Sequence, residues 1–361
     1  MNTIQTLPTM RKSIIIWLLT GCLLIAAMVV IGGITRLTGS GLSITEWKLI
    51  RGTIPPLNEQ QWQEEFENYK AIPQYQKLNY HFTLDDFKQI YFWEYFHRLI
   101  GRVIGMVFLI PFLFFWMKKQ FDRKLMRNVL LLFALGAFQG FLGWFMVKSG
   151  LTKNTYVSHY RLAIHLISAF ITFGFTFKVA LDLIYPENKP YDLHLKKTLS
   201  FSMDNFRSCY LADIYGAFVA GLHAGHIFNN FPKMDDDWIS SSVSFALQKN
   251  GITALFDAIP VVQFIHRYVA YVAVLLILYL FFMARNFNRA RMNNLFSAEL
   301  KNAVNLLPVI VLLQFILGVF TLLYSVPVWL GVLHQIVAFI LFALMVFLIH
   351  RLQSGKMPAT N

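Results

Sequence analysis

Eight long apolar segments limit what this chain can fold into. Runs of roughly 20 apolar residues occur near positions 14–34, 93–116, 127–147, 160–184, 205–225, 262–283, 303–324 and 329–350. A helix of this length crosses the hydrocarbon core of a bilayer and satisfies its own backbone hydrogen bonds there. The sequence therefore predicts an all-α polytopic membrane protein with eight transmembrane helices.

The composition is typical of a protein embedded in lipid. The 361 residues are 56% hydrophobic and 14% charged, whereas soluble domains carry about 25% charged residues. The net charge of +13 is spread over short basic clusters between the apolar runs, which favours a lipid bilayer as partner and argues against nucleic acid. Cys22 and Cys209 lie in or beside apolar segments and predict neither a disulfide framework nor a cysteine metal site.

Loop charges predict the orientation of the chain. The connections 118–127 and 285–301 are rich in Lys and Arg, whereas the loops 35–92 and 226–260 carry more acidic than basic residues. Eight spans with both termini cytoplasmic satisfy all four loops, although hydropathy alone leaves the fifth span undecided because residues 204–213 are unusually polar. The first apolar run has no small-residue cleavage site, and the segment before it is too short for an organelle transit peptide. We therefore expect a bacterial plasma (inner) membrane.

An internal repeat divides the chain into two halves. His97 and His266 are separated by the same number of residues as His165 and His334 (266 − 97 and 334 − 165, both 169), and Q-x-x-L-G-x-F precedes each second histidine at 139–145 and 314–320. Four spans per half return the chain to its starting side, so the repeats run parallel about an axis along the membrane normal. The predicted architecture is two pseudo-symmetric four-helix bundles.

The predicted segments follow from this repeat. They are a cytoplasmic N-terminus (1–13), a first bundle (14–184) with a long external loop (35–92), a connector (185–204), a second bundle (205–350) and a cytoplasmic tail (351–361). Within the external loop, Trp62, Phe66 and Tyr69 form one stripe of a short amphipathic helix, which we interpret as either a lid or a packed cap. Thr83 and Asp86 resemble a capping box for a helix that runs into the second span.

The four repeated histidines are the candidate ligands. We expect each of them in the first turn or two of an even-numbered span, near the outer leaflet. Two imidazoles on facing helices of a bundle can ligate a haem iron axially, and Arg98, Arg161 and Arg267 are placed to contact haem propionates. A single such histidine is more often a polar residue bonded across helices, and zinc would require three or four converging ligands.

The halves differ three residues before the first histidine, where Glu94 in one half corresponds to Gln263 in the other. Positions i and i+3 share a helix face, so Glu94 is expected to project toward the ligand of His97. A carboxylate there can act as base or acid, or stabilise positive charge on a substrate carbon. The alternative is an interfacial carboxylate paired with Arg98. The difference suggests a haem for chemistry in the first half and one for electron transfer in the second.

These residues resemble the haem A synthase family, membrane enzymes that convert haem O to haem A for cytochrome oxidases. The resemblance extends over about residues 14–350. It rests on GGITRLTGSGLSITEWK (32–48) with the following G-T-I-P-P-L, EYFHR (94–98), QGFLGWFMVKSGL (139–151), HL (165–166), GAFVAGLHAG with N-x-x-P-x-M (216–234), HR (266–267) and HQ (334–335).

The resemblance implies a role for each candidate residue. It assigns His97 and His165 to the substrate haem, His266 and His334 to a bound haem b, and Glu94 to the essential carboxylate. The implied reaction oxidises one methyl group of haem O to a formyl group through a hydroxylated intermediate, with electrons supplied from outside the site. Some family members carry a cysteine pair in the first outer loop, which this chain lacks, so no redox role of such a pair transfers.

Two other functions fit the histidines, a di-haem b-type cytochrome that only transfers electrons and a haem transporter. The common depth of the ligands and the presence of Glu94 weigh against the cytochrome. The electron donor, the oxygen source, a homo-oligomeric state and docking of a haem O synthase as substrate donor are left open by the sequence. So are the roles of His223 and His226 in GLHAGHIF.

Overall fold

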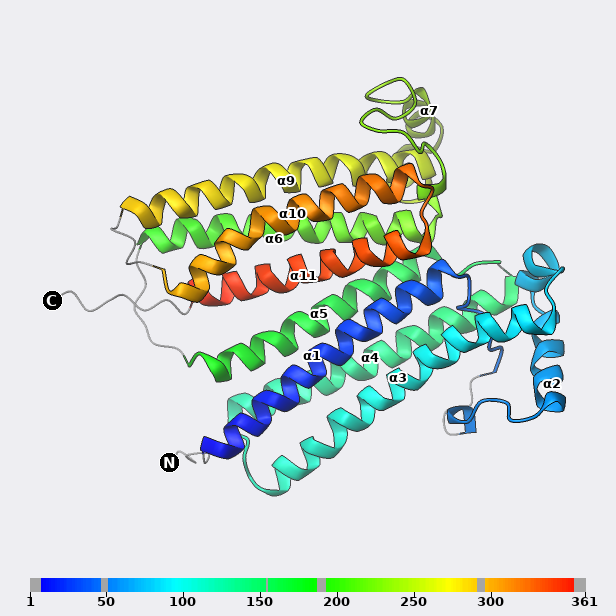
Figure 1. The fold of residues 1–361 in the computed structure, drawn as a ribbon, viewed down its shortest axis with the longest axis horizontal. Coiled ribbons are helices and arrows are strands. Elements are labelled where there is room, and N and C mark those ends of the chain that lie inside the picture. The colour runs from blue at the N-terminus through cyan, green and yellow to red at the C-terminus, as the bar shows by residue number, and fades with distance from the viewer. Residues whose placement is uncertain (1–7, 47–50, 154, 187–192, 291–295, 354–361) are drawn as a thin grey trace. The chain divides into compact units, whose positions relative to one another are not determined.

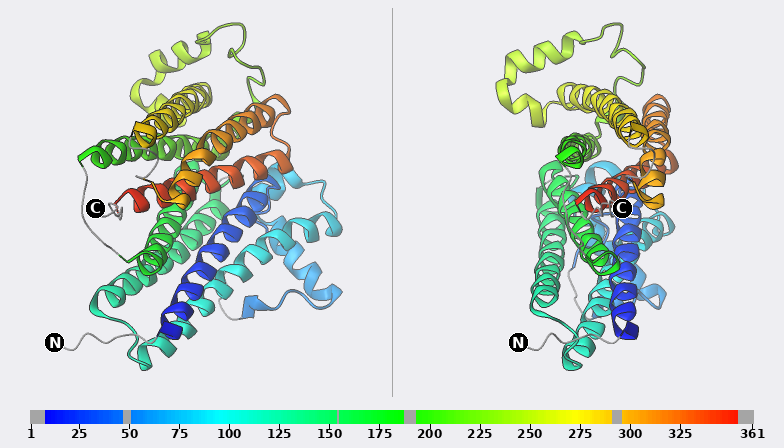
Figure 2. Two further views of the ribbon diagram at one scale, coloured as in Figure 1. Left: turned by 60° about the vertical axis from the view of Figure 1, so that its left-hand side comes forward. Right: turned by 90° about the vertical axis from the view of Figure 1, so that its left-hand side faces the viewer.

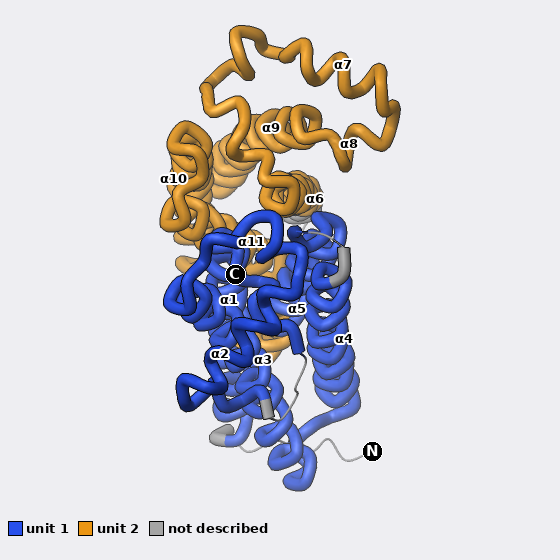
Figure 3. Tube along the Cα trace, turned by 90° about the vertical axis from the view of Figure 1, so that its right-hand side faces the viewer, with its two compact units in different colours: residues 1–176 blue, residues 177–361 orange. Residues whose placement is uncertain are grey.

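A computed structural model describes residues 8–46, 51–153, 155–186, 193–290 and 296–353. Among these residues all regular elements are helices, joined by loops, and an isolated bridge between Met234 and Asp237 is the sole β-type pairing there. The chain divides into two compact units, Met1–Thr176 and Phe177–Asn361 (Figure 3). The prediction of an all-α protein is confirmed.

Four long helices build the first unit: α1 (Pro8–Leu37), α3 (Leu84–Met117), α4 (Arg123–Lys153) and α5 (His159–Ile184), whose last residues pass into the second unit (Figure 1). Side chains connect them in sequence. Trp17 of α1 donates its indole N–H to the Val107 carbonyl of α3 at 3.0 Å. Phe108 of α3 meets Phe133 of α4. Gln139 of α4 bonds to Ser168 of α5 at 2.6 Å.

The second unit contains a closed ring of four helices. These are α6 (Leu193–Gly221), α9 (Ile259–Ala290), α10 (Ala298–Leu323) and α11 (Val328–Gln353). Contacts join α6 to α9, α9 to α10, α10 to α11 and α11 to α6, and Figures 1 and 2 show the four running side by side. Ile277, Leu280, Leu307 and Met345 are fully buried between them. Such a bundle brings side chains from facing helices together in its core.

Shorter elements lie outside the bundles. In the first unit, α2 (Glu59–Lys70) packs on the start of α3 through Phe66, Tyr69 and Phe87, all buried, which confirms the predicted amphipathic helix and favours the packed cap. In the second unit, α7 (Ser241–Asn250) and α8 (Ala254–Asp257) pack against α9, and Figures 1 and 3 show α7 at the end where α9 begins.

The capping box predicted at Thr83 is confirmed and has a consequence for His97. Thr83 Oγ1 accepts the Asp86 N–H, and Asp86 accepts the Thr83 N–H, so α3 begins at Leu84. His97 therefore lies roughly four turns into α3, which begins before the predicted span 93–116 as the capping box implied. The position of His97 within that span stays a prediction. His165, His266 and His334 lie near the starts of α5, α9 and α11 as expected.

Seven of the described helices are long and apolar enough to cross a membrane: α1, α3, α4, α5, α9, α10 and α11. The predicted fifth span belongs to α6, a helix of 29 residues that does not meet the same condition. Some of its polar residues are engaged locally, since Arg207 pairs with Asp204 at 2.9 Å and Asn205 donates to the Phe201 carbonyl. The chain is thus a multi-pass membrane protein, while the count of eight spans stays a prediction.

Some predicted features fall outside the described residues. These are residues 1–7 of the cytoplasmic N-terminus, 187–192 of the connector and 354–361 of the tail. The functional division of the chain at residues 184 and 205 also stays a prediction. Cys22 and Cys209 are both free and buried.

Candidate functional site

Each of the four repeated histidines faces a glycine on the preceding long helix of the same half. That helix is α1 for α3, α4 for α5, α6 for α9 and α10 for α11. A methyl group added at Gly32 of α1 would lie 3.3 Å from His97 Nε2, and one at Gly143 of α4 would lie 3.5 Å from His165 Cε1. In the second half the corresponding distances are 3.3 Å from Gly216 of α6 to His266 and 2.9 Å from Gly318 of α10 to His334. The missing side chain lets each imidazole lie against a helix backbone.

The histidines associate in two pairs. His97 lies near enough to His165, and His334 near enough to His266, for the charged forms of each pair to repel one another. The members of each pair come from different helices, α3 with α5 and α9 with α11. All four are partly exposed. Each unit therefore brings together the two imidazoles that the repeat predicted.

Hydrogen bonds fix both imidazoles of the second half. His266 Nδ1 lies 3.2 Å from the Ala212 carbonyl of α6, and His334 Nδ1 lies 3.1 Å from the Gln314 carbonyl of α10. Because a carbonyl only accepts, each Nδ1 carries the proton and each Nε2 keeps its lone pair. Gln314 Nε2 lies 3.4 Å from His334 Nε2, as a weak donor to that lone pair. This is the tautomer that binds a metal through Nε2.

The first half holds its imidazoles differently. Within the described chain, neither His97 nor His165 bonds to a backbone carbonyl, and His165 Nδ1 is buried without a hydrogen-bond partner. Packing against Gly32 and Gly143 positions these rings, but no hydrogen bond fixes their orientation. Among the described residues, the two pairs thus differ in the hydrogen bonds that hold their rings.

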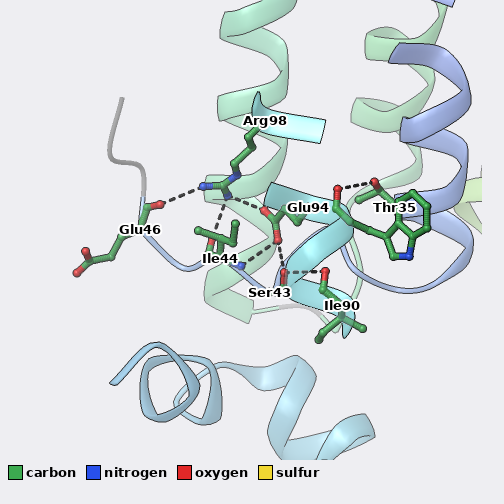
Figure 4. A network of polar contacts seen from close by, with 8 residues as sticks. Thr35, Ser43, Ile44, Glu46, Ile90, Glu94 and Arg98 are labelled. Carbon is green, nitrogen blue, oxygen red and sulfur yellow. Dashed lines mark hydrogen bonds and ion pairs between the residues drawn. The ribbon is translucent and has the colours of Figure 1, made fainter. Parts of the chain in front are cut away.

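Glu94 is buried at 2% exposure and accepts three hydrogen bonds (Figure 4). Oε2 receives the Ser43 hydroxyl at 2.7 Å and the Ile44 N–H at 2.9 Å, and Oε1 receives the Arg98 guanidinium at 2.6 Å. Arg98 also donates to the carbonyls of Ile44 and Glu46. The loop after α1 is thereby attached to α3 around one carboxylate. Sequence reasoning anticipated the Arg98 contact but not the role of Ser43.

Gln263 occupies the equivalent position in the second half, and its amide donates instead of accepting. Nε2 donates to the carbonyls of Ala224 at 3.0 Å and Ile227 at 2.6 Å. Arg267 donates to carbonyls of the same loop, those of Phe228, Asn230 and Lys233. In both halves the arginine after the first histidine attaches a loop from earlier in the chain to the helix.

The three arginines predicted to contact propionates all have protein partners. Arg98 and Arg267 bond to loop carbonyls, and the Arg161 guanidinium lies 4.4 Å from the centre of the Phe145 ring. Their contact with propionates stays a prediction. The rings of His223 and His226 lie 6.2 Å apart. Among the described residues, no cluster of three or more His, Cys, Asp or Glu residues forms a metal site.

Comparison with known proteins gives the family. Residues 15–346 match the family described as "Cytochrome oxidase assembly protein". A protein of Flavobacterium psychrophilum named "Heme A synthase" is 52% identical over 94% of this chain and 98% of its own length. Proteins of the same name from Flavobacterium johnsoniae and Nitrosomonas eutropha are 51% and 44% identical, over 95% and 91% of this chain and 98% and 90% of their own lengths.

The chain belongs to the cytochrome oxidase assembly protein family. The family match covers all four histidines, Glu94 and the loop that holds it, and the first and last helices of the bundles. This agrees with the family resemblance found in the sequence.

Sequence reasoning missed several residues that shape this assembly protein's candidate site. Gly318 was within reach because it occupies the same place in the repeated Q-x-x-L-G-x-F motif as Gly143. Gly32 and Gly216 have no common motif, and the carbonyls of Ala212 and Gln314 carry no side-chain signal at all. Contacts of this kind arise only when helices are packed together.

Proposed function

We propose that this chain is a haem A synthase, an enzyme of haem A biosynthesis that takes haem O as substrate and releases haem A. The observation that carries the proposal is near full-length similarity to relatives of that name, at up to 52% identity, in a chain that pairs two imidazoles in each half. The reaction oxidises a methyl group of haem O to a formyl group. Replacing two C–H bonds by one C=O bond is a four-electron oxidation of this carbon, two electrons at each stage, so the intermediate is the alcohol. An external oxidant takes up these electrons, and an external molecule, dioxygen or water, supplies the oxygen atom.

His266 and His334 are assigned to a resident haem b. A haem b bound there would supply one-electron transfer. The residues fit such a group because both Nδ1 atoms donate to carbonyls, which orients each ring and leaves Nε2 for iron. Hydrogen bonds of this kind raise the basicity of a histidine ligand and hold its orientation. They suit a cofactor that remains in place through many turnovers.

His97 and His165 are assigned to the substrate haem. No hydrogen bond to a carbonyl fixes either ring within the described chain, and both face a glycine backbone. A substrate must enter and its product must leave, so weaker orientation of the ligands is compatible with exchange. The apolar tail of haem O would lie among the membrane helices.

Glu94 is assigned a role in the chemistry at the substrate methyl group. Its carboxylate is buried and held by three donors, so it provides negative charge at a fixed position. Fixed charge in a site of low dielectric stabilises positive charge that develops on a carbon in the transition state. Gln263 has no charge to contribute, and this agrees with an electron-transfer role for the second half.

The proposed setting is a bacterial plasma membrane with both termini in the cytoplasm, a haem O synthase as substrate donor and a separate electron donor. Basic connections at 118–127 and 285–301 support this orientation. All four histidines then lie toward the outer side.

Pigment extraction tests the proposal. Membranes containing the chain, with and without a haem O supply, are extracted and their haems separated by chromatography. Haem A should form only with haem O, and the haem O and haem A fractions should disappear in His97→Ala or His165→Ala. Haem b should depend on His266 and His334. A chain that retained two b-type haems and formed no haem A would instead be a di-haem cytochrome.

Glu94→Ala separates binding from chemistry in the same assay. The variant should retain haem and stall before the formyl product, because the ligands stay in place while the fixed charge is removed. Wild-type haem A output from this variant would exclude Glu94 from catalysis.

A further inference from the structure

Glu94 and Gln263 occupy equivalent positions, each three residues before the first histidine of its half, yet they meet outer loops of opposite hydrogen-bonding character. The loop after α1 presents donors to position 94, the Ser43 hydroxyl and the Ile44 N–H. The loop after α6 presents acceptors to position 263, the carbonyls of Ala224 and Ile227. The chemical difference between the halves is therefore matched in the backbone around it.

The donor loop is firmly placed. Ser43 is fully buried, and its N–H donates to the Ser40 carbonyl at 3.2 Å. Its hydroxyl lies 2.7 Å from Glu94 Oε2 and 3.4 Å from the Ile90 carbonyl, so Glu94 is the better acceptor. Figure 4 shows the carboxylate between this loop and Arg98. Three donors converge on one side chain.

We infer that Ser43 is a positioning residue for Glu94, and that the Ser43 hydroxyl, the Ile44 N–H and the Arg98 guanidinium form a three-donor seat that selects a carboxylate at position 94. The inference rests on the proposed function, because it concerns the carboxylate to which that function assigns the chemistry. Ser43 acts through Glu94 and has no contact with the substrate in this assignment.

The selectivity follows from hydrogen-bond accounting. A carboxylate has two acceptor oxygens and can satisfy Ser43, Ile44 and Arg98 together. An amide has one acceptor oxygen, so its NH₂ group would face one of these donors. In the second half the loop presents acceptors instead of donors. An ionised carboxylate at position 263 would therefore face two carbonyl oxygens and could donate a hydrogen bond to neither. A buried polar group left in that state costs more than an ordinary hydrogen bond contributes.

Ser43→Ala tests the positioning role, with Ser40→Ala as a matched control. Ser40 is equally buried in the same loop, but its hydroxyl bonds to Thr38 at 2.6 Å and not to Glu94. Both variants are supplied with haem O, and haem content and haem A formation are measured separately. At equal haem content, we expect Ser43→Ala to form haem A roughly tenfold more slowly and Ser40→Ala to match the wild type.

Two further variants exclude a merely structural effect. Ser43→Thr keeps the hydroxyl and should restore most of the rate. The double variant Ser43→Ala/Glu94→Gln should be no slower than Glu94→Gln alone, because Ser43 has no carboxylate left to position. Equal rates for Ser43→Ala and Ser40→Ala, or an additive double variant, would overturn the inference. A wild-type chain that made no haem A would refute the proposed function itself.

The second half provides a test that needs no turnover. Gln263→Glu and Gln263→Met are compared for haem b content per protein. The carboxylate faces two carbonyl oxygens, whereas the methionine removes the polar group, so Gln263→Glu should retain roughly tenfold less haem b than Gln263→Met. Equal retention would show that the loop does not select the side chain, even if Ser43→Ala failed to accumulate.

Discussion

At the scale of single residues, the absence of a side chain is as important as the ligands themselves. Each imidazole of the candidate site lies against a glycine, and the tightest approach is between Gly318 and His334 Cε1. The ring cannot move away freely, because Nδ1 is bonded to the Gln314 carbonyl on the same helix as Gly318. Position and hydrogen bonding of this ligand are thus set by one short stretch of α10.

Gly318→Ala should reduce haem b retention roughly tenfold. The new methyl group would lie 2.9 Å from His334 Cε1, so the ring must shift and strain its hydrogen bond, and overpacking of this kind costs about 1–3 kcal/mol. The absorbance of haem b per purified protein measures the effect. Gly136→Ala is the control, since a methyl group there meets no atom within 4 Å. Equal haem b content in the two variants would contradict the argument.

At the scale of elements, the external segment around α2 is a small packed structure of its own. Tyr69 is fully buried, stacks on Phe87 and bonds through its hydroxyl to Gln74 and Asn79. Burial of the phenol raises the pKa of Tyr69 to about 12, because the charged form is poorly solvated there. The neutral phenol therefore contributes stability to this segment.

Stability contributed by Tyr69 should be lost between about pH 10 and 12. Below pH 10 the phenol is neutral in both states, whereas above it the unfolded phenol ionises first, which lowers the free energy of unfolding by about 2 kcal/mol by pH 12. Thermal unfolding of the wild type and Tyr69→Phe at several pH values measures this difference. Tyr80→Phe, at an exposed position, serves as control. A wild type and Tyr69→Phe with parallel pH profiles would refute the expectation.

At the scale of the whole molecule, the two halves repeat one plan with two sets of hydrogen bonds. Each half pairs imidazoles from two helices and attaches an outer loop through the arginine after its first histidine. Only the second half, among the described residues, adds a bond from each ligand Nδ1 to a carbonyl. A repeated scaffold thus supports one oriented ligand pair and one that is held by packing alone.

Haem transfer from the purified chain to apomyoglobin should occur in two phases. The fast phase is haem leaving His97 and His165, and the slow phase is haem b leaving the second half, whose ligands are strengthened by their hydrogen bonds. We expect the rate constants of the two phases to differ by about tenfold or more, because each ligand of the second half makes a hydrogen bond between neutral groups, worth about 1 kcal/mol. Stopped-flow absorbance resolves them, and His334→Ala should lose the slow phase. A single phase in the wild type would oppose the assignment.

Sequence patterns predicted much of the architecture. Apolar runs placed the seven candidate spans, the 169-residue spacing paired the histidines, and Thr83 with Asp86 marked the start of α3, because these signals are local or periodic. The sequence did not show how the imidazoles of His97 and His165 are held, because packing against a glycine backbone carries no local signal. The sequence also left undecided whether α6 spans the membrane. In the structure α6 does not meet the condition of length and apolar composition that the seven candidate spans meet.

The sequence by itself determined that this chain is helical, spans a membrane several times and repeats one pair of histidines, because apolar periodicity and equal spacing are properties of the chain alone. Only the tertiary structure decided which glycine backs each imidazole, which carbonyls orient His266 and His334, and that Ser43 and Ile44 hold Glu94. Those contacts join side chains to groups that lie tens of residues away in the chain, several of them backbone groups. A backbone carbonyl or N–H is the same in every residue, so its role appears only once packing gives it a partner.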